Sequence, residues 1–264
     1  MKIKHILSTL ALLLCAFLLA SCAPIFIPTG GTADTEPPET TPAETTPPET
    51  QPPALKKRVA ITFDDGPSRQ GLTEKLVDEL AKYGGKATFF VLGNLISAST
   101  GESLAYASAH GCEIAIHAYT HEKYFDTCSE AAFYEELELT EKAIQRYVDA
   151  PVTLLRPPGG RITDARALAS GYPIILWSVD SEDWRYKSRA DEDTIRTNVH
   201  TIVENVLSQV EDGDIILMHE IYMNSYEATC QILKELDALG YEFVTVTELI
   251  GESGLTPGET VYRK

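Results

Sequence analysis

The most regular feature of the chain beyond residue 55 is an alternation of amphipathic stretches with short apolar runs. A glycine stands between the two in most units, where it is typical of the end of a helix. A short, uninterrupted apolar run predicts a strand that is buried on both faces. YASAHGCEIAIHA, ALASGYPIILWSV and ELDALGYEFVTV are examples. The pattern therefore predicts an α/β fold in which helices alternate with parallel strands.

Seven apolar runs qualify as strands of this fold. Seven parallel strands with helices between them predict a barrel or a near-closed relative of one. The runs are residues 59–63, 86–92, 112–117, 152–155, 173–179, 214–219 and 241–246.

Polar side chains stand at the ends of most of these runs. In parallel α/β folds the carboxyl ends of the strands open on one face, so residues far apart in the sequence can converge there. We expect a catalytic site at this face. The residues are Asp64 and Asp65 after the first strand, His117 and His121 after the third, Arg156 after the fourth, Asp180 and Asp183 after the fifth, and His219 after the sixth.

Two adjacent carboxylates occur in ITFDDGP, residues 61–67. Asp64 and Asp65 repel each other unless a cation lies beside them. A cation bound by one carboxylate would leave the other free to accept a proton. Asp-Gly-Pro is also ordinary turn chemistry, and this stretch alone does not decide between the two interpretations.

HAYTH places His117 and His121 four residues apart, a spacing that brings two imidazoles to one face for a metal. Together with an aspartate from another strand, they form a candidate Asp-His-His set with an open coordination position, which is the pattern of a catalytic site.

The first 22 residues have the pattern of a bacterial signal peptide. Lys2 and Lys4 precede an apolar run that ends in small residues. LASC, residues 19–22, resembles a lipobox, which implies cleavage before Cys22 and attachment of lipid to its sulfur. Cleavage without lipid would instead release the protein. We expect residues 1–22 to be a lipoprotein signal peptide, with the lipid on Cys22 as the only membrane attachment.

Residues 23–54 are rich in Thr, Pro and Glu and contain little to bury, as in TEPPETTPAETTPPETQPP. Such a composition predicts a disordered, extended tether. The folded domain is therefore expected at residues 55–264.

The formal net charge of -17 argues against a nucleic-acid partner. Once the signal and the lipobox are set aside, three cysteines remain, and an odd number cannot form a complete disulfide framework. Cys112 is expected in the core, whereas the sequence leaves open whether Cys128 and Cys230 pair.

Six motifs, in order, resemble those of the polysaccharide deacetylases related to the rhizobial chitooligosaccharide deacetylase, also called carbohydrate esterase family 4. The resemblance extends from about residue 59 to residue 250. It implies a distorted (β/α) barrel of about seven parallel strands and metal-dependent removal of acetyl groups from N-acetylated sugars. The motifs are TFDDGP (62–67), KATFFVLG (86–93), HAYTH (117–121), RPPGG (156–160), DSEDW (180–184) and ILMH (216–219).

Carried over position by position, the resemblance implies that Asp65, His117 and His121 bind the metal. Asp64 would then be the general base that deprotonates the attacking water. His219 would be the general acid that protonates the leaving amine.

The same resemblance implies supporting roles for five further residues. Asp183 would orient the general acid and raise its pKa, and Arg156 would pair with the base aspartate. The backbone N–H of Gly159 would stabilise the oxyanion. Trp184 and Leu217 would form the apolar pocket for the acetyl methyl group.

Two positions depart from the family pattern. Ala118 stands where Ser or Thr is usual, which removes a hydroxyl that could brace the ligand loop, so we expect a somewhat weaker metal affinity. Gly159 stands where an aromatic is usual, so we expect a wider cleft and a looser oxyanion site. Every metal-binding and proton-transferring position is kept, which predicts an active enzyme.

These features predict a lipid-anchored, extracytoplasmic bacterial hydrolase that cleaves the linear amides of N-acetylglucosamine or N-acetylmuramic acid residues in peptidoglycan or a surface polysaccharide. Zinc is the expected metal, and cobalt or nickel would also fit the ligands. We expect a monomer whose partners are the glycan and the membrane. An O-acetyl esterase of the acetylxylan type and a non-catalytic carbohydrate-binding homologue remain alternatives.

Overall fold

The computed structural model describes residues 56–187 and 191–264, which belong to one unit, Pro53–Lys264. Its strands form a six-stranded sheet and a second, two-stranded sheet. The larger sheet contains β1 (Lys57–Gly66), β2 (Thr88–Leu92), β3 (Glu113–Ala118), β5 (Val179–Asp180), β6 (Ile215–His219) and β7 (Tyr241–Phe243), and the smaller contains β4 (Ile174–Ile175) and β8 (Thr260–Val261).

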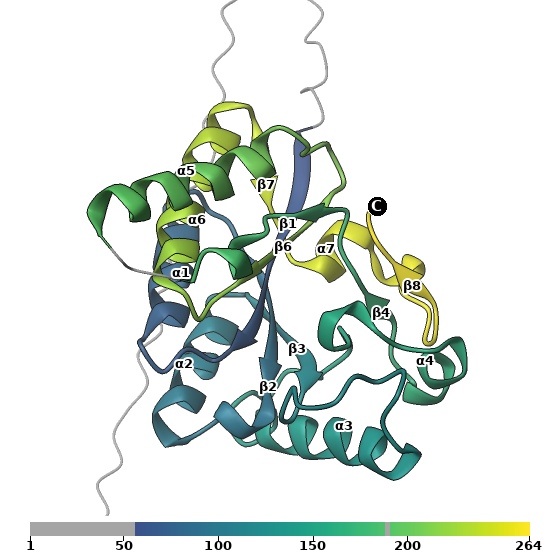
Figure 1. Ribbon diagram of the computed structural model, residues 1–264. Coiled ribbons are helices and arrows are strands. Elements are labelled where there is room, and N and C mark those ends of the chain that lie inside the picture. Colours follow the sequence, from purple (N-terminus) through teal and green to yellow (C-terminus); the bar gives the residue numbers. More distant parts are fainter. Residues whose placement is uncertain (1–55, 188–190) are drawn as a thin grey trace, which may run out of the picture. The chain divides into compact units, whose positions relative to one another are not determined.

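The strands run around a nearly closed parallel barrel. Along the larger sheet the order is β3-β2-β1-β6-β5, with β7 paired to the first residues of β1, and all of these pairs are parallel (Figure 1). Leu155 forms parallel bridges both to Ile116 of β3 and to Ile174 of β4. Since β4 and β5 lie in one short stretch of chain, these bridges continue the ring from β3 back to β6. The prediction of a distorted (β/α) barrel is confirmed.

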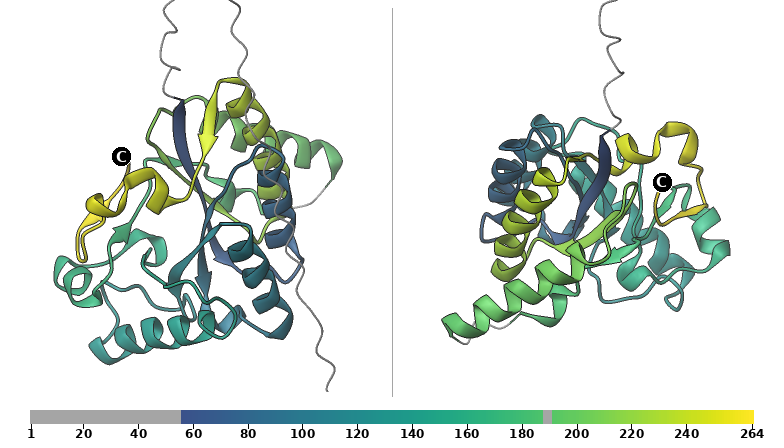
Figure 2. Two further views of the ribbon diagram at one scale, coloured as in Figure 1. Left: turned by 180° about the vertical axis from the view of Figure 1, so that it is seen from behind. Right: turned by 90° about the horizontal axis from the view of Figure 1, so that it is seen from above.

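Helices cover the outside of the barrel. α1, α2, α5 and α6 lie together on one side of the larger sheet, whereas α4 and β8 lie on the opposite side (Figures 1 and 2). The helices are α1 (Leu72–Ala81), α2 (Ala98–Ala109), α3 (Glu130–Ile144), α4 (Asp164–Ser170), α5 (Glu192–Leu207), α6 (Met223–Ala238) and α7 (Val246–Ile250), with 3₁₀ turns at Gly93–Leu95, Pro158–Gly160, Asp183–Arg185 and Glu252–Gly254.

Local sequence sets where several helices begin. The side chains of Ser97, Ser129, Thr163, Asp191 and Thr245 accept hydrogen bonds from backbone N–H groups in the first turns of α2, α3, α4, α5 and α7. Each bond satisfies a donor that the start of a helix leaves unpaired.

Three of the predicted strands are shorter than expected. Residues 152–155 make only the bridges of Leu155, since Pro157, which has no N–H to donate, follows closely. Residues 173–179 divide into β4 and β5, because Leu176 N–H donates to Val261 while Ser178 N–H donates to Ile215. In residues 241–246, β7 ends at Phe243 because Thr245 already caps α7.

Within the described ranges, no helix is both long and apolar enough to cross a bilayer. Cys112 is buried, as expected, and Cys112, Cys128 and Cys230 are all free thiols, so the last two do not pair. The expected signal peptide (1–22), Cys22 and the tether (23–54) lie outside the described residues.

Candidate active site and metal centre

The alternation of side chains along the strands brings polar residues to the inner face of the barrel. One apolar cluster inside the barrel contains Ala60 of β1, Ala115 of β3 and Ile215 of β6. Successive side chains of a strand point to opposite faces, so residues two and four positions further on share this face. They are Thr62 and Asp64 on β1, His117 on β3, and Leu217 and His219 on β6.

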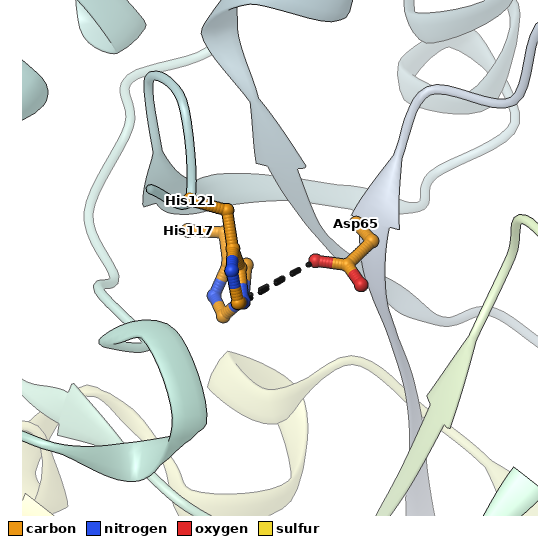
Figure 3. A group of neighbouring side chains, drawn as sticks. All are labelled: Asp65, His117 and His121. Carbon is orange, nitrogen blue, oxygen red and sulfur yellow. Dashed lines mark ion pairs between the residues drawn. The ribbon is translucent and has the colours of Figure 1, made fainter. Parts of the chain in front are cut away.

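Asp65, His117 and His121 form a compact group that could hold a metal ion. Their potential ligand atoms all lie within 4.8 Å of one another. Asp65 Oδ1 is 3.6 Å from His117 Nε2 and 3.7 Å from His121 Nε2, and the two imidazoles face the carboxylate from one side (Figure 3). Asp65 Oδ1 is also buried with no hydrogen-bond partner among the described residues. A buried, unpaired carboxylate oxygen is costly, and a cation would satisfy it.

The imidazole of His117 is held in the orientation that a metal ligand requires. Its Nδ1 lies 2.7 Å from the backbone oxygen of Arg156, so Nδ1–H donates there and Nε2 is left facing Asp65. Burial lowers the pKa of His117, although the charges of Asp64 and Asp65 oppose this effect. The ring is therefore held in the neutral form that binds metals.

Two of the three candidate ligands have strained backbone. In the described part of the chain, the non-glycine residues with positive φ are Asp65 (68°), His121 (62°) and Glu182 (55°). The left-handed region is uncommon for such residues and persists where the surroundings impose it. Here it turns the side chains of Asp65 and His121 toward a common point.

Glu136 of α3 holds residues 119–121, the loop that bears the candidate ligand His121, called here the ligand loop. Its Oε2 accepts the N–H groups of Tyr119 and Thr120 at 2.7 and 2.8 Å, and its Oε1 accepts the Thr120 hydroxyl at 2.7 Å. Glu136 is buried, and so is Ala118 at the end of β3. The brace that a hydroxyl at residue 118 could supply thus comes from a different element.

Arg156 lies fully buried at the centre of the site. Its Nη1 donates to Asp64 Oδ1 at 2.8 Å and to the Thr62 hydroxyl at 2.7 Å. Its Nε and Nη2 donate to the backbone oxygens of Ile175 and Leu176, each at 3.0 Å. Asp64 Oδ2 lies 3.8 Å from Nε2 of His117, one of the candidate ligands. One oxygen of Asp64 is fixed by Arg156, and the other faces the candidate ligands.

His219 and Asp183 form a second charged pair. His219 Nδ1 lies 2.7 Å from Asp183 Oδ1, and Asp183 Oδ2 accepts the N–H of His219 at 2.8 Å and the hydroxyl of Ser225. Burial by itself lowers the pKa of His219, but the charge and hydrogen bond of Asp183, with the charges of Asp64 and Asp65, raise it from 6.5 to about 9. His219 is therefore an imidazolium at neutral pH, with Nε2–H left to donate.

The remaining predicted residues lie near this centre. Gly159 is exposed in the 3₁₀ turn after Arg156, with φ of 59°, and Tyr124 occupies the space beside it. Leu217 is buried on β6, and Trp184 follows Asp183 with 40% of its surface exposed. The described contacts do not link Trp184 with Leu217, so a methyl pocket formed by both stays a prediction.

Several residues of the site escaped the sequence analysis. Thr62 lies in an apolar strand and Glu136 lies in a helix with many acidic residues, so neither stands out from its neighbours in the sequence.

Glu220 is fully buried, and its carboxyl group packs directly against Gly66. A Cβ added to Gly66 would lie only 1.5 Å from Glu220 Oε1. Burial raises the pKa of Glu220 to about 8, although hydrogen bonds from Thr73 and Ser68 act to lower this pKa. The one sequence feature that could have pointed to Glu220 is Gly66, because a residue without a Cβ lets another side chain approach its backbone this closely.

Comparison with known proteins gives concordant results. A family model described as polysaccharide deacetylase matches residues 51–172. The peptidoglycan-N-acetylglucosamine deacetylase PgdA of Listeria monocytogenes is 35% identical over 196 residues, covering 74% of this chain. This chain spans only 39% of the length of that protein. A peptidoglycan-N-acetylglucosamine deacetylase of Bacillus cereus is 34% identical over 203 residues, covering 74% of this chain and 89% of its own.

Among solved structures, a family 4 acetyl xylan esterase from Clostridium thermocellum, in complex with a cobalt ion, superposes with a TM-score of 0.69 at 28% identity. The match covers 78% of this chain and 98% of that chain.

The pKa of His219 can be measured directly in the metal-free protein. We expect the imidazole to titrate near pH 9, and Asp183→Asn to lower this pKa, because the substitution removes the charge that outweighs burial. Titration of the ring nitrogens by NMR measures both values. A wild-type pKa at or below 6.5, or no change in the variant, would contradict the assigned interaction.

The brace of the ligand loop predicts an effect on metal affinity. Glu136→Gln replaces an acceptor with an amide that faces two N–H donors, so we expect zinc affinity to fall by about 10-fold. The control is Glu138→Gln on the same helix, since Glu138 is exposed and paired only with Lys142 in the described contacts. Competition with a chromophoric chelator measures both affinities. Equal zinc affinity in both variants would rule out the brace.

Proposed function

The chain belongs to the polysaccharide deacetylase family, and we propose that it removes acetyl groups from N-acetylglucosamine or N-acetylmuramic acid residues of peptidoglycan or a surface polysaccharide. The observation that carries this proposal is the arrangement of Asp64 and His219. A carboxylate anchored by Arg156 and a protonated imidazole anchored by Asp183 lie on the same inner face, beside an Asp-His-His group. Metal-assisted amide hydrolysis uses such a base, acid and Lewis acid together.

Asp65, His117 and His121 are the proposed ligands of a divalent metal, with zinc first and cobalt or nickel as alternatives. The nitrogen and oxygen donors and the unpaired Oδ1 of Asp65 fit such an ion. When bound, the ion supplies Lewis-acid chemistry, which acidifies water and polarises the acetyl carbonyl.

Asp64 is the proposed general base. Its Oδ2, left free by Arg156, accepts a proton from the water that attacks the acetyl carbon. Arg156 restrains the carboxylate so that this oxygen stays directed at the site. As the new carbon–oxygen bond forms, negative charge develops on the former carbonyl oxygen, and the N–H of Gly159 donates to it.

His219 is the proposed general acid. Because Nδ1–H is committed to Asp183, Nε2–H delivers its proton to the leaving nitrogen as the carbon–nitrogen bond breaks. The products are acetate and a free amine on the sugar. The raised pKa of His219 keeps this proton in place at neutral pH.

The substrate class follows the relatives. The Listeria and Bacillus cereus proteins are named as peptidoglycan deacetylases, and the Clostridium thermocellum protein as an acetyl xylan esterase. An O-acetylated polymer is therefore the second candidate substrate. The residues that move protons would serve both reactions, so only a comparison of substrates separates them.

We further propose that the protein acts outside the cytoplasm as a monomer held to the membrane by a lipid on Cys22. The sequence LASC and the Thr, Pro and Glu-rich residues 23–54 support this proposal. A tether of this composition would let the domain reach glycan at a distance from the bilayer.

The proposed activity is tested by acetate release from N-acetylglucosamine oligomers, peptidoglycan and acetylated xylan. We expect release by a soluble fragment of residues 54–264 to stop on chelation and to return with zinc. Asp64→Asn should lower kcat by at least about 100-fold, because the base is lost. Asp193→Asn, at an aspartate whose side chain is 90% exposed on α5, is the control and should keep wild-type kcat.

The outcomes distinguish the candidates. Release from xylan alone would replace the N-acetylated substrate with an O-acetylated one. Zinc binding without release from any substrate would favour the non-catalytic carbohydrate-binding homologue.

The lipid anchor makes a separate prediction for the full chain. Cys22→Ala should move the protein from the membrane fraction to the soluble fraction, because one cysteine sulfur carries the lipid. Cell fractionation with labelled fatty acid measures this, and Cys128→Ala is the control. Membrane retention of the Cys22→Ala protein would refute the anchor.

A further inference from the structure

Two adjacent glycines form the turn that carries the proposed oxyanion donor. Gly159 and Gly160 have φ of 59° and 69°, in the left-handed region that glycine adopts without strain. The N–H of Gly160 donates to the backbone oxygen of Pro157, and the N–H of Arg161 donates to that of Pro158. Glycine pairs are the most mobile sequences available to a backbone, whereas an oxyanion donor has to be preorganised.

An aromatic ring lies close to each of the two glycines. A Cβ on Gly159 would lie 3.1 Å from Cε1 of Tyr124, and a Cβ on Gly160 would lie 3.2 Å from Cη2 of Trp177. Both distances are shorter than ordinary contacts between a Cβ and its neighbours. An aromatic ring thus lies beside each glycine, in the space that a side chain of that residue would need.

Tyr124 is itself held in place by two residues. The guanidinium carbon of Arg161 lies 4.2 Å from the centre of the Tyr124 ring. Arg161 Nε and Nη2 donate to Asp126 Oδ2 at 3.0 and 2.8 Å. Tyr124, Arg161 and Asp126, called here the Tyr124 clamp, thus join the loop after His121 to the residue that follows Gly160.

We propose that Tyr124 is a positioning residue that fixes Gly159 so that its N–H is aimed at the developing oxyanion. This inference rests on the proposed function. The ring from the β3–α3 loop takes the place of the side chain that residue 159 lacks. Through Arg161 and Asp126 it also connects this turn to the loop that bears His121. The positions of the proposed oxyanion donor and of this candidate metal ligand are therefore linked.

The clamp predicts a loss of turnover rather than of substrate affinity. A displaced oxyanion donor weakens an interaction that forms in the transition state, so kcat falls while KM changes little. Removal of one such donor costs about 100- to 1000-fold in kcat, and a loosened donor should cost less. We expect Tyr124→Ala to lower kcat by about 10- to 100-fold and to leave KM within about threefold.

The experiment compares three variants of the zinc-loaded fragment of residues 54–264. Tyr124→Phe keeps the ring and should retain kcat within about threefold of wild type. Tyr134→Ala is the matched control, since Tyr134 is 44% exposed and Tyr124 is 42% exposed, and its ring packs on Phe133. An unchanged kcat in Tyr124→Ala, or a raised KM with kcat unchanged, would overturn the proposal.

A second measurement does not depend on activity. Hydrogen exchange of the Gly160 amide reports on its 2.9 Å bond to Pro157. We expect faster exchange in Tyr124→Ala, wild-type exchange in Tyr124→Phe and Tyr134→Ala, and equal zinc affinity in all of them. If the wild type released no acetate from any glycan, the proposed function would fail while the exchange data still tested the clamp. Equal exchange in Tyr124→Ala and wild type would refute it.

Discussion

The rest of the site depends on the buried ion pair between the Arg156 guanidinium and the Asp64 carboxylate. A fully buried charge is tolerated only when it is paired and its donors are satisfied. Arg156 is paired with Asp64 and also donates to Thr62 and to the backbone oxygens of Ile175, the last residue of β4, and of Leu176, which follows it. Its own backbone oxygen orients His117. Removal of one partner would leave a buried charge at a cost of about 3–5 kcal/mol, so barrel and site are stabilised together.

Two neighbouring aspartates can serve one site because β1 ceases to be regular at Asp65. In a regular strand the two side chains would point to opposite faces. Asp65 instead has φ of 68°, and the register with β2 shifts between Asp64 and Gly66. Asp64 stays on the inner face with Arg156, and Asp65 turns toward the two histidines. This division allows one carboxylate to bind a cation while the other remains available for a proton.

The sequence predicted the barrel, and the face where Asp65, His117 and His121 lie together, because both rest on short-range pattern. The assignment of these residues as metal ligands came from the family resemblance and stays a prediction. Apolar runs with terminal polar residues marked the strands and their shared face, and HAYTH marked the histidine pair. The supports of the site were not predictable in this way. Glu136 and Tyr124 reach the ligand loop and Gly159 through tertiary packing, so the expected losses at Ala118 and Gly159 ignored groups supplied by other elements. Strand ends at residues 155 and 243 were likewise set by caps and prolines outside the apolar pattern.

We propose that Asp65 binds the metal while Asp64 remains with Arg156. A high-resolution crystal structure of the zinc-loaded domain, with anomalous scattering to locate the ion, tests this division between the two aspartates. We expect one ion bound by Asp65, His117 and His121, with Asp64 outside the ligand set and still hydrogen-bonded to Arg156. An ion bound elsewhere, or an Asp64 that leaves Arg156 to coordinate it, would refute the division.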